Sequence, residues 1–277
     1  MSGAHQYTLA MILSFASAGP AGQVLLAASV LSALLYAWVA SAHQARPRAL
    51  ILAWSLHLLA LVVDIAGLGT GLPGARFGFA PALSMTIWLV LGVYLVESRF
   101  LPLPSAQRVL SLAAVAVLLL AAAFPGESRP QAASPWAPLH WVLGLASYGL
   151  FGVAVLHAAM LSRAERQMRT QPGSGSIGLP LLRLERLTFQ FVGAGVLVLS
   201  AALLMGWLFS PQWRWDHKTL FAVLGWLVLT GLLTGRQVFG WRGRRATRWL
   251  YLGAALLLLS YAGSRFVLEV VLQRGMS

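Results

Sequence analysis

The sequence predicts an all-α fold, a polytopic membrane helix bundle of eight transmembrane helices. Only 10% of the 277 residues are charged and 58% are hydrophobic, whereas a soluble domain carries about 25% charged residues. Such a chain cannot cover its surface with polar groups, and lipid is the solvent that suits it. Eight apolar segments each approach the ~20 residues that a spanning helix needs. No compelling boundary divides them, so we expect a single integral membrane domain over residues 1–277.

Proline-containing stretches separate the first five predicted spans and indicate where each helix ends. The spans are residues 20–41, 48–68, 78–97, 105–124 and 138–161. The stretches between them are "ARPR" at 45–48, "LPGAR" at 72–76, "LPLPS" at 101–105 and "FPGESRP" at 124–130.

The last three predicted spans cover residues 188–209, 218–236 and 247–271. The longest connection, 162–187, precedes them, holds five arginines and is interrupted by "QPGSGSIGLP". We interpret this connection as a polar linker that enforces the membrane topology. The alternative is that its second half, "LPLLRLERL", lies along the membrane surface as an amphipathic turn or two.

The basic residues predict the orientation of the chain in the lipid bilayer. The net charge is +13, but Lys and Arg punctuate the apolar runs rather than gather in one domain, so we expect no nucleic-acid partner. Alternate connections hold 14 and 6 of these 20 residues. The positive-inside rule places the richer set in the cytoplasm. Both termini, and the stretch "RWDHK" at 214–218, then lie outside.

Two histidines mark the candidate site, because each opens a predicted span at the outer membrane surface. His140 opens the fifth span and His217 the seventh, so both lie at the same depth. Two neutral imidazoles can ligate an iron axially, and flat aromatic side chains pack well against a porphyrin. The aromatic neighbours in sequence are Trp136, Trp141, Trp213 and Trp215. The alternative is an ordinary aromatic belt, since Trp and His are both common at membrane interfaces.

Two further histidines lie deeper, where polar groups are costly and often functional. His57 falls near the middle of the second span, and His157 follows His140 by 17 residues, or about 25 Å along a helix. They can mark a path across the membrane. Asp64 also lies in the second span, and we interpret it as the ion-pair partner of Arg265 at a similar predicted depth.

Several chemistries are excluded by absent motifs. The chain contains no Walker loop for nucleotides, no HExxH zinc motif and no GxSxG nucleophile elbow. It contains no cysteine, which excludes disulfides and thiolate metal sites.

Three segments carry a family resemblance: "HWVLGLASYGLFGVAVLHAAMLSRAERQMR" at 140–169, "QWRWDHKT" at 212–219 and "GWRGRRATRWLYLGAALLLLSYAGSRFVLEVVL" at 240–272. They resemble the cytochrome c assembly superfamily of haem-handling membrane proteins, most of all its small eight-span HemX-like or YpjD-like branch. The similarity runs from about residue 48 to the end. It implies a multi-pass inner (plasma) membrane protein that binds or delivers non-covalent b-type haem for cytochrome c assembly.

The resemblance also implies roles for single residues. In the superfamily a tryptophan-rich periplasmic segment ends in a Trp–Asp pair that contacts haem, and periplasmic histidines ligate the iron. The tail of that segment matches Trp213, Trp215 and Asp216. His140 matches the histidine ahead of it, and Tyr148 a tyrosine that follows this histidine. No histidine follows His217 in the chain, so His217 is the candidate for the second ligand.

The same resemblance implies partners among proteins of cytochrome c maturation, apocytochrome c included. The tryptophan segment is short and no large periplasmic domain is evident, so we expect haem binding or delivery rather than thioether formation by this chain alone.

Two alternatives stay open. Intramembrane polar groups such as His57, His157 and Asp64 are also typical of small-ion or small-molecule transporters. The basic loops at 162–187 and 236–248 are also compatible with a membrane scaffold or regulator.

Overall fold

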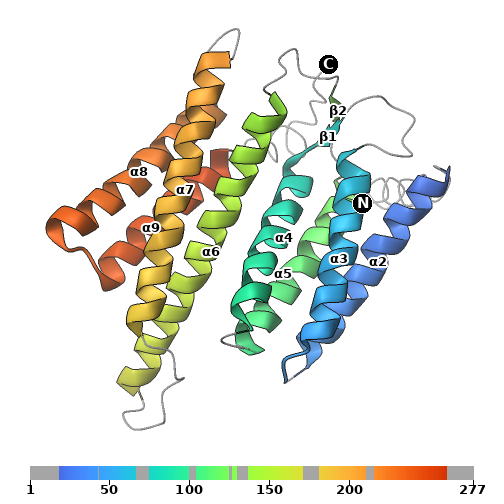
Figure 1. Ribbon diagram of the computed structural model, residues 1–277, viewed down its shortest axis with the longest axis horizontal. Coiled ribbons are helices and arrows are strands. Elements are labelled where there is room, and N and C mark those ends of the chain that lie inside the picture. The colour runs from blue at the N-terminus through green and yellow to red at the C-terminus, as the bar shows by residue number, and fades with distance from the viewer. Residues whose placement is uncertain are drawn as a thin grey trace, which may run out of the picture. The chain divides into compact units, whose positions relative to one another are not determined.

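The computed structural model describes residues 19–42, 44–66, 75–99, 104–124, 127–129, 137–170, 181–209 and 215–260. Within these ranges the chain forms eight α-helices and two three-residue strands (Figure 1). They belong to two compact units, Met1–Ala133 and Ser134–Ser277, and each unit has its own architecture.

The first unit is a ring of four helices, α2 (Gly19–Ser41), α3 (Pro47–Ile65), α4 (Phe79–Glu97) and α5 (Pro104–Ala123). Each helix packs against the next, and α5 returns to pack against α2. Pro47 and Pro104 stand at the first positions of α3 and α5, where the missing N–H leaves no helix hydrogen bond unmade. Strands β1 (Ala75–Phe77) and β2 (Glu127–Arg129) pair antiparallel, with Arg76 opposite Ser128. This ribbon joins the connection before α4 to the one after α5, which places both connections at one end of the ring.

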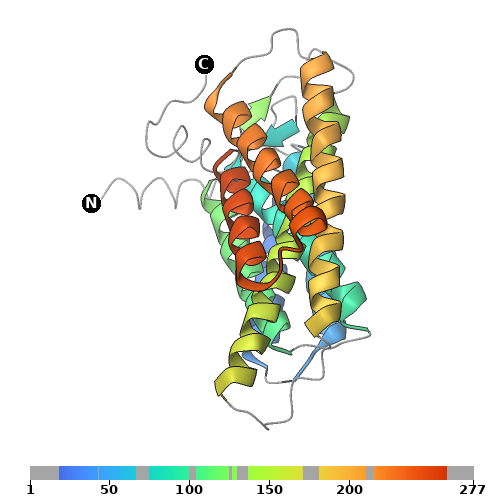
Figure 2. The ribbon, with the colours of Figure 1, turned by 90° about the vertical axis from the view of Figure 1, so that its left-hand side faces the viewer.

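The second unit repeats this plan with α6 (Ala137–Thr170), α7 (Leu181–Phe209), α8 (His217–Phe239) and α9 (Gly243–Leu258). Consecutive helices pack together, and α9 closes the ring against α6. Figure 2 shows α8 and α9 running side by side, with α7 next to α8. Apolar side chains from all four helices fill the core, among them Phe151, Val192, Leu229 and Leu257.

Glycines allow two helices of the second unit to approach closely. A Cβ atom at Gly225 of α8 would lie 2.8 Å from Leu257 of α9, and one at Gly253 of α9 would lie 2.5 Å from Leu229 of α8. Small residues at such crossings let helix backbones pack without steric overlap. The turn between the two helices is made by Gly240, whose φ of 63° is the left-handed conformation that favours glycine at a helix C-terminus.

The outer surfaces of the helices confirm the membrane class. Large apolar side chains remain exposed along them, such as Leu119 at 62% and Leu197 at 72%. Exposed apolar surface on this scale is a liability in water and suits contact with lipid. Seven helices are long and apolar enough to cross a membrane, namely α2 to α8. The described part of the eighth predicted span is α9, and residues 261–277 lie outside the described ranges, so the number of spans and the location of both termini stay predictions.

The structure corrects the prediction for the connection at 162–187. Helix α6 continues to Thr170 and α7 begins at Leu181, so the described residues on both sides of 171–180 are helical and the predicted bounds of the two spans were too short. The reason is a helical apolar pattern within "LLRLERL": Leu184 is buried, whereas Arg183 and Arg186 are exposed. The short ribbon of β1 and β2 was also not predicted, because segments of three residues leave no periodic signal.

Candidate functional site

The two site histidines stand at the same end of the second unit, where α6 and α8 begin. His140 lies in the first turns of α6 and is half-buried. Its Nδ1 lies 2.9 Å from the carbonyl oxygen of Ala202 on α7. Because a carbonyl oxygen can only accept, Nδ1 is the donor, and in the neutral ring Nε2 keeps its lone pair. His140 is therefore held in one tautomer by the neighbouring helix.

Asp216 fixes the beginning of α8. Its carboxylate accepts a hydrogen bond from the backbone N–H of Thr219 at 2.8 Å, which is the N-cap arrangement that satisfies a free helix donor. Although partial burial acts to raise it, the hydrogen bonds from Thr219 and the charge of Lys218 hold the pKa of the Asp216 carboxyl below its ordinary value. Asp216 is thus ionised at neutral pH, and it sets His217 at the first helical position.

Lys218 connects the beginning of α8 to the rest of the site. Its carbonyl oxygen accepts a hydrogen bond of 2.8 Å from the hydroxyl of Ser260, just after α9. This hydrogen bond joins the first turn of α8 to the residues just after α9.

Four hydrogen bonds that involve a side chain connect neighbouring helices around this ring, one for each pair of neighbours. Tyr148 of α6 donates through its hydroxyl to the carbonyl of Leu257 on α9 at 3.0 Å. Trp226 of α8 donates through Nε1 to the hydroxyl of Ser200 on α7 at 2.8 Å. The bonds of His140 and Lys218 complete the set. Sequence reasoning missed Ser200, Trp226 and Ser260, because a lone polar group in an apolar helix indicates that a partner exists but not which one.

The aromatic residues predicted for the site differ in exposure. Trp141 is half-buried, and Trp215 is 69% exposed beside Asp216. Trp213 lies outside the described residues. His217 is exposed.

His57 lies in the core of the first unit and has no exposed surface. Its Nε2 is 2.8 Å from the hydroxyl of Ser84 on α4, and its Nδ1 is 3.4 Å from the hydroxyl of Tyr36 on α2. Both ring nitrogens therefore have hydrogen-bonding partners within the unit. Asp64 is also buried in this unit. Arg265, its predicted partner, lies outside the described residues.

His157 is buried between two helices of the second unit. Its ring stacks on Phe191 of α7, with ring centroids 5.4 Å apart and planes inclined by 18°. His157 is 2% exposed. The described structure thus places both deep histidines in packed helix contacts.

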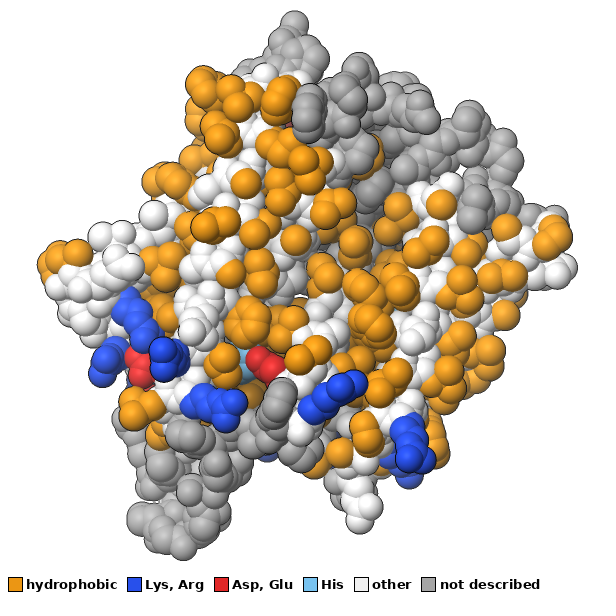
Figure 3. All heavy atoms as spheres, in the orientation of Figure 1, with side chains coloured by type: hydrophobic (Ala, Val, Ile, Leu, Met, Phe, Trp, Pro, Cys, Tyr) orange, Lys and Arg blue, Asp and Glu red, His pale blue; other side chains and the backbone are white. Residues whose placement is uncertain are grey.

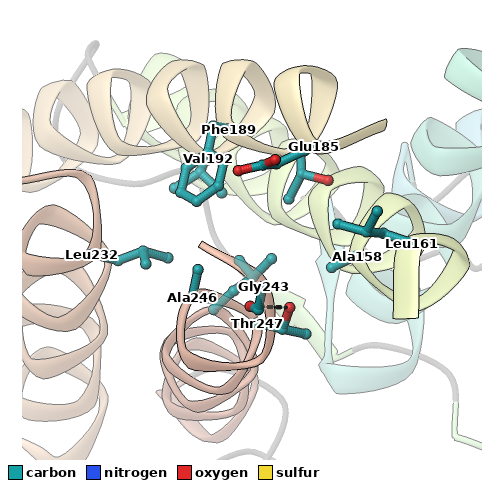
Figure 4. Close-up of a pocket in the computed structure, with 11 residues that line it drawn as sticks. Ala158, Leu161, Glu185, Phe189, Val192, Leu232, Gly243, Ala246 and Thr247 are labelled. Carbon is teal, nitrogen blue, oxygen red and sulfur yellow. Dashed lines mark hydrogen bonds between the residues drawn. The ribbon is translucent and has the colours of Figure 1, made fainter. Parts of the chain in front are cut away.

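A small cavity lies at the other end of the second unit, surrounded by side chains of all four helices (Figure 4). The cavity volume of ≈ 10 Å³ leaves room for about one water molecule. Glu185 of α7 borders the cavity and forms ion pairs with Arg236 at 3.8 Å and Arg242 at 3.6 Å. The Arg236 guanidinium also lies 3.5 Å from the ring centre of Phe189. Sequence reasoning did not single out Glu185, although an acid within an arginine-rich segment is a signal for ion pairs.

Comparison with known proteins gives the family of this fold. The family model described as "Cytochrome C assembly protein" matches residues 18–272. An uncharacterized 28.8 kDa protein of Azospirillum brasilense is 34% identical over 152 residues, which cover 52% of this chain and 56% of that relative's length. Inner membrane protein YpjD of Escherichia coli is 29% identical over 232 residues, or 80% of this chain and 85% of the relative. Cytochrome c biogenesis protein CcsA of Prochlorococcus marinus is 22% identical over 67% of this chain and 71% of its own length. No solved structure matches.

Proposed function

This chain belongs to the cytochrome c assembly protein family, and from that premise we propose that it binds haem non-covalently at the outer face of the inner membrane and delivers it for cytochrome c assembly. The membrane location is supported by seven helices capable of spanning a bilayer and by a relative named as an inner membrane protein. A role in cytochrome c assembly is supported by the relatives named as cytochrome c biogenesis proteins. The haem is b-type, held by side chains rather than by thioether bonds.

The observation that carries this proposal is the hydrogen bond from His140 to the carbonyl of Ala202 at 2.9 Å. A metal-ligating histidine commonly donates its other ring N–H to a carbonyl or carboxylate, which fixes the tautomer and the ring orientation. His140 has this arrangement. Its Nε2 keeps the lone pair that an axial ligand of haem iron requires.

We assign the second ligand to His217. Asp216 caps α8 and Ser260 binds the carbonyl of Lys218, so the chain on both sides of His217 is held in place. His140 and His217 each lie in the first turn of their helix, α6 and α8, which supports placing both ligands at one end of the unit. The exposed side chain of His217 is accessible to a ligand without rearrangement of a packed core.

The remaining predicted site residues act around this pair. Trp141, Trp213 and Trp215 supply flat apolar walls, and an indole N–H suits a polar edge. Tyr148 contributes by holding α6 against α9 below His140. A ligated haem would supply a low-spin iron centre with a characteristic absorption spectrum.

A transit role for His57 and His157 stays a prediction. The hydrogen bonds of His57 to Ser84 and Tyr36 favour a packing role for this side chain, because ligation would break at least one of them. We expect apocytochrome c or other maturation proteins as partners, and we expect no lyase activity from this chain alone.

The proposal is tested by the absorption spectrum of the purified full-length protein, together with a pyridine haemochrome assay. The wild type is expected to show a Soret band of a low-spin, bis-histidine haem. His140→Ala and His217→Ala are each expected to lose haem or to become high-spin, and added imidazole should restore the low-spin spectrum. His43→Ala serves as the control, because this histidine is predicted at the opposite membrane face.

Two results would contradict the assignment. A wild-type spectrum retained in either ligand variant would remove that histidine from the site. A protein that stays colourless after incubation with hemin, while eluting as a folded species in gel filtration, would remove haem binding altogether.

A further inference from the structure

The end of the second unit opposite the candidate haem site carries a dense group of exposed arginines. They are Arg183 and Arg186 at the beginning of α7, and Arg242, Arg244, Arg245 and Arg248 around the turn into α9. Within the described part of the chain, Glu185 is the one acid in ion-pair distance of this group, 3.6 Å from Arg242. Among the described residues, most of this positive charge therefore has no matching carboxylate.

Stacked aromatic rings lie among these arginines. Trp241 stacks with Phe239 and with Trp249, at ring-centroid distances of 6.1 and 6.2 Å. The Arg245 guanidinium lies 4.5 Å from the ring centre of Trp241. Phe239 is 72% exposed. We name Phe239, Trp241, Arg242, Arg244, Arg245, Arg248 and Trp249 together the basic–aromatic surface. Figure 3 shows Lys and Arg side chains gathered where α8 and α9 meet, next to hydrophobic side chains.

The backbone holds this surface in a defined shape. A Cβ atom at Gly235 of α8 would lie 2.5 Å from the Trp241 ring, so Trp241 folds back directly onto the helix backbone. Helix α9 has no acidic residue in its first turn and no side-chain cap at its N-terminus. Several arginines thus stand at the positive end of a helix dipole, an arrangement that a bound anion would stabilise.

The location of the surface identifies the kind of anion. It follows α8, a helix long and apolar enough to cross a membrane, and exposed apolar residues such as Val238 adjoin it. Aromatic rings beside exposed arginines are typical of the level where acyl chains meet headgroups. The anion available at that depth is lipid phosphate, and the planar guanidinium group matches phosphate oxygens in pairs.

We propose that the basic–aromatic surface binds the phosphate headgroups of anionic phospholipids. These lipids belong to the membrane leaflet opposite the candidate haem site. An acidic soluble protein is the competing occupant, but it would leave the exposed apolar members of the surface without a role. This binding site is independent of haem.

The test is native mass spectrometry of the full-length protein in detergent, titrated with phosphatidylglycerol or phosphatidylcholine. Each arginine near an anionic membrane surface contributes an attraction worth about a fivefold change in affinity. R244Q/R245Q should therefore weaken phosphatidylglycerol binding by roughly 25-fold, whereas phosphatidylcholine binding stays weak in both proteins. The matched control R48Q/R99Q removes two exposed arginines of the first unit and should change the affinity less than about threefold.

Two outcomes would overturn the proposal. An equal loss in both double variants would show a general attraction to net positive charge rather than a site. Unchanged phosphatidylglycerol binding in R244Q/R245Q would show that lipid phosphate does not bind at these arginines.

Discussion

The side chain of Asp216 illustrates how one residue determines the geometry of the candidate site. The sequence resemblance placed it next to haem, whereas the structure shows it as the N-cap of α8. These two descriptions are compatible, because a cap that positions His217 acts on the site through the helix rather than by contact. The deep histidines show that a residue's polarity does not by itself reveal its role. Polarity singled out His57, but its hydrogen bonds to Ser84 and Tyr36 depend on three helices meeting.

Removal of the cap should weaken the protein measurably. Asp216→Ala leaves the Thr219 N–H without its acceptor and is expected to cost about 1 kcal/mol of unfolding free energy, whereas Asp216→Asn should cost only a few tenths. Thermal unfolding followed by circular dichroism in detergent measures both. Equal stability of the wild type and Asp216→Ala would show that the cap contributes nothing.

The Asp216 carboxylate also makes the stability of the fold depend on pH, and it stabilises the fold when it is ionised. The folded pKa of Asp216 lies below its ordinary value, so its ionised form stabilises the fold above the unfolded pKa of about 3.9. That contribution is lost as the pH falls through the folded pKa. The stability difference between the wild type and Asp216→Asn should therefore narrow in acid, and a difference that widens would contradict the assignment.

At the scale of elements, the apolar runs in the sequence predicted where the helices lie but not which helix faces pack together. The eight predicted spans all contain a described helix, because apolar runs of that length have few other solutions in lipid. The ends of α6 and α7 were predicted less well, since both helices extend into arginine-rich sequence whose apolar pattern continues on one face. Which faces of α8 and α9 meet could not be predicted, because glycines occur at several positions along both helices.

A pair of glycines on α8 tests that crossing. Gly225→Ala places a methyl group 2.8 Å from Leu257 and 3.3 Å from the backbone oxygen of Gly253, and overpacking of this kind costs about 1–3 kcal/mol. Gly231→Ala meets nothing within 4 Å and should be neutral or stabilising by up to ~1 kcal/mol. Unfolding by denaturing detergent compares the two variants. Similar values for both would show that α8 and α9 do not pack at Gly225.

At the scale of the whole molecule, orientation in the bilayer is the property that function depends on most. The distribution of 14 and 6 basic residues over alternate connections predicts that the turn after α8 is cytoplasmic and that the beginning of α8 is outside. Within each unit the four helices pack against their neighbours in sequence and close into a ring, so an orientation measured at one connection constrains the others of that unit.

The absence of cysteine makes this orientation directly measurable. Trp215→Cys and Phe239→Cys each introduce a single thiol, at sites that are 69% and 72% exposed. A membrane-impermeant maleimide applied to spheroplasts should label Cys at 215 and should label Cys at 239 only after lysis. The unmodified chain, without any thiol, gives the background, and the reverse labelling pattern would invert the proposed location of the haem site.

Composition and apolar run length by themselves determined that this protein is a helical membrane protein. In lipid the backbone must satisfy its hydrogen bonds internally, as a helix or a closed barrel, and continuous apolar runs of ~20 residues have the length of a spanning helix. The distribution of Lys and Arg over the connections predicted the orientation, because the positive-inside rule needs only the sequence of each connection. Only the tertiary structure decided which polar groups meet, as with His140 and Ala202 across α6 and α7. Such pairs join residues far apart in the sequence, and their distances depend on how four helices close into a ring.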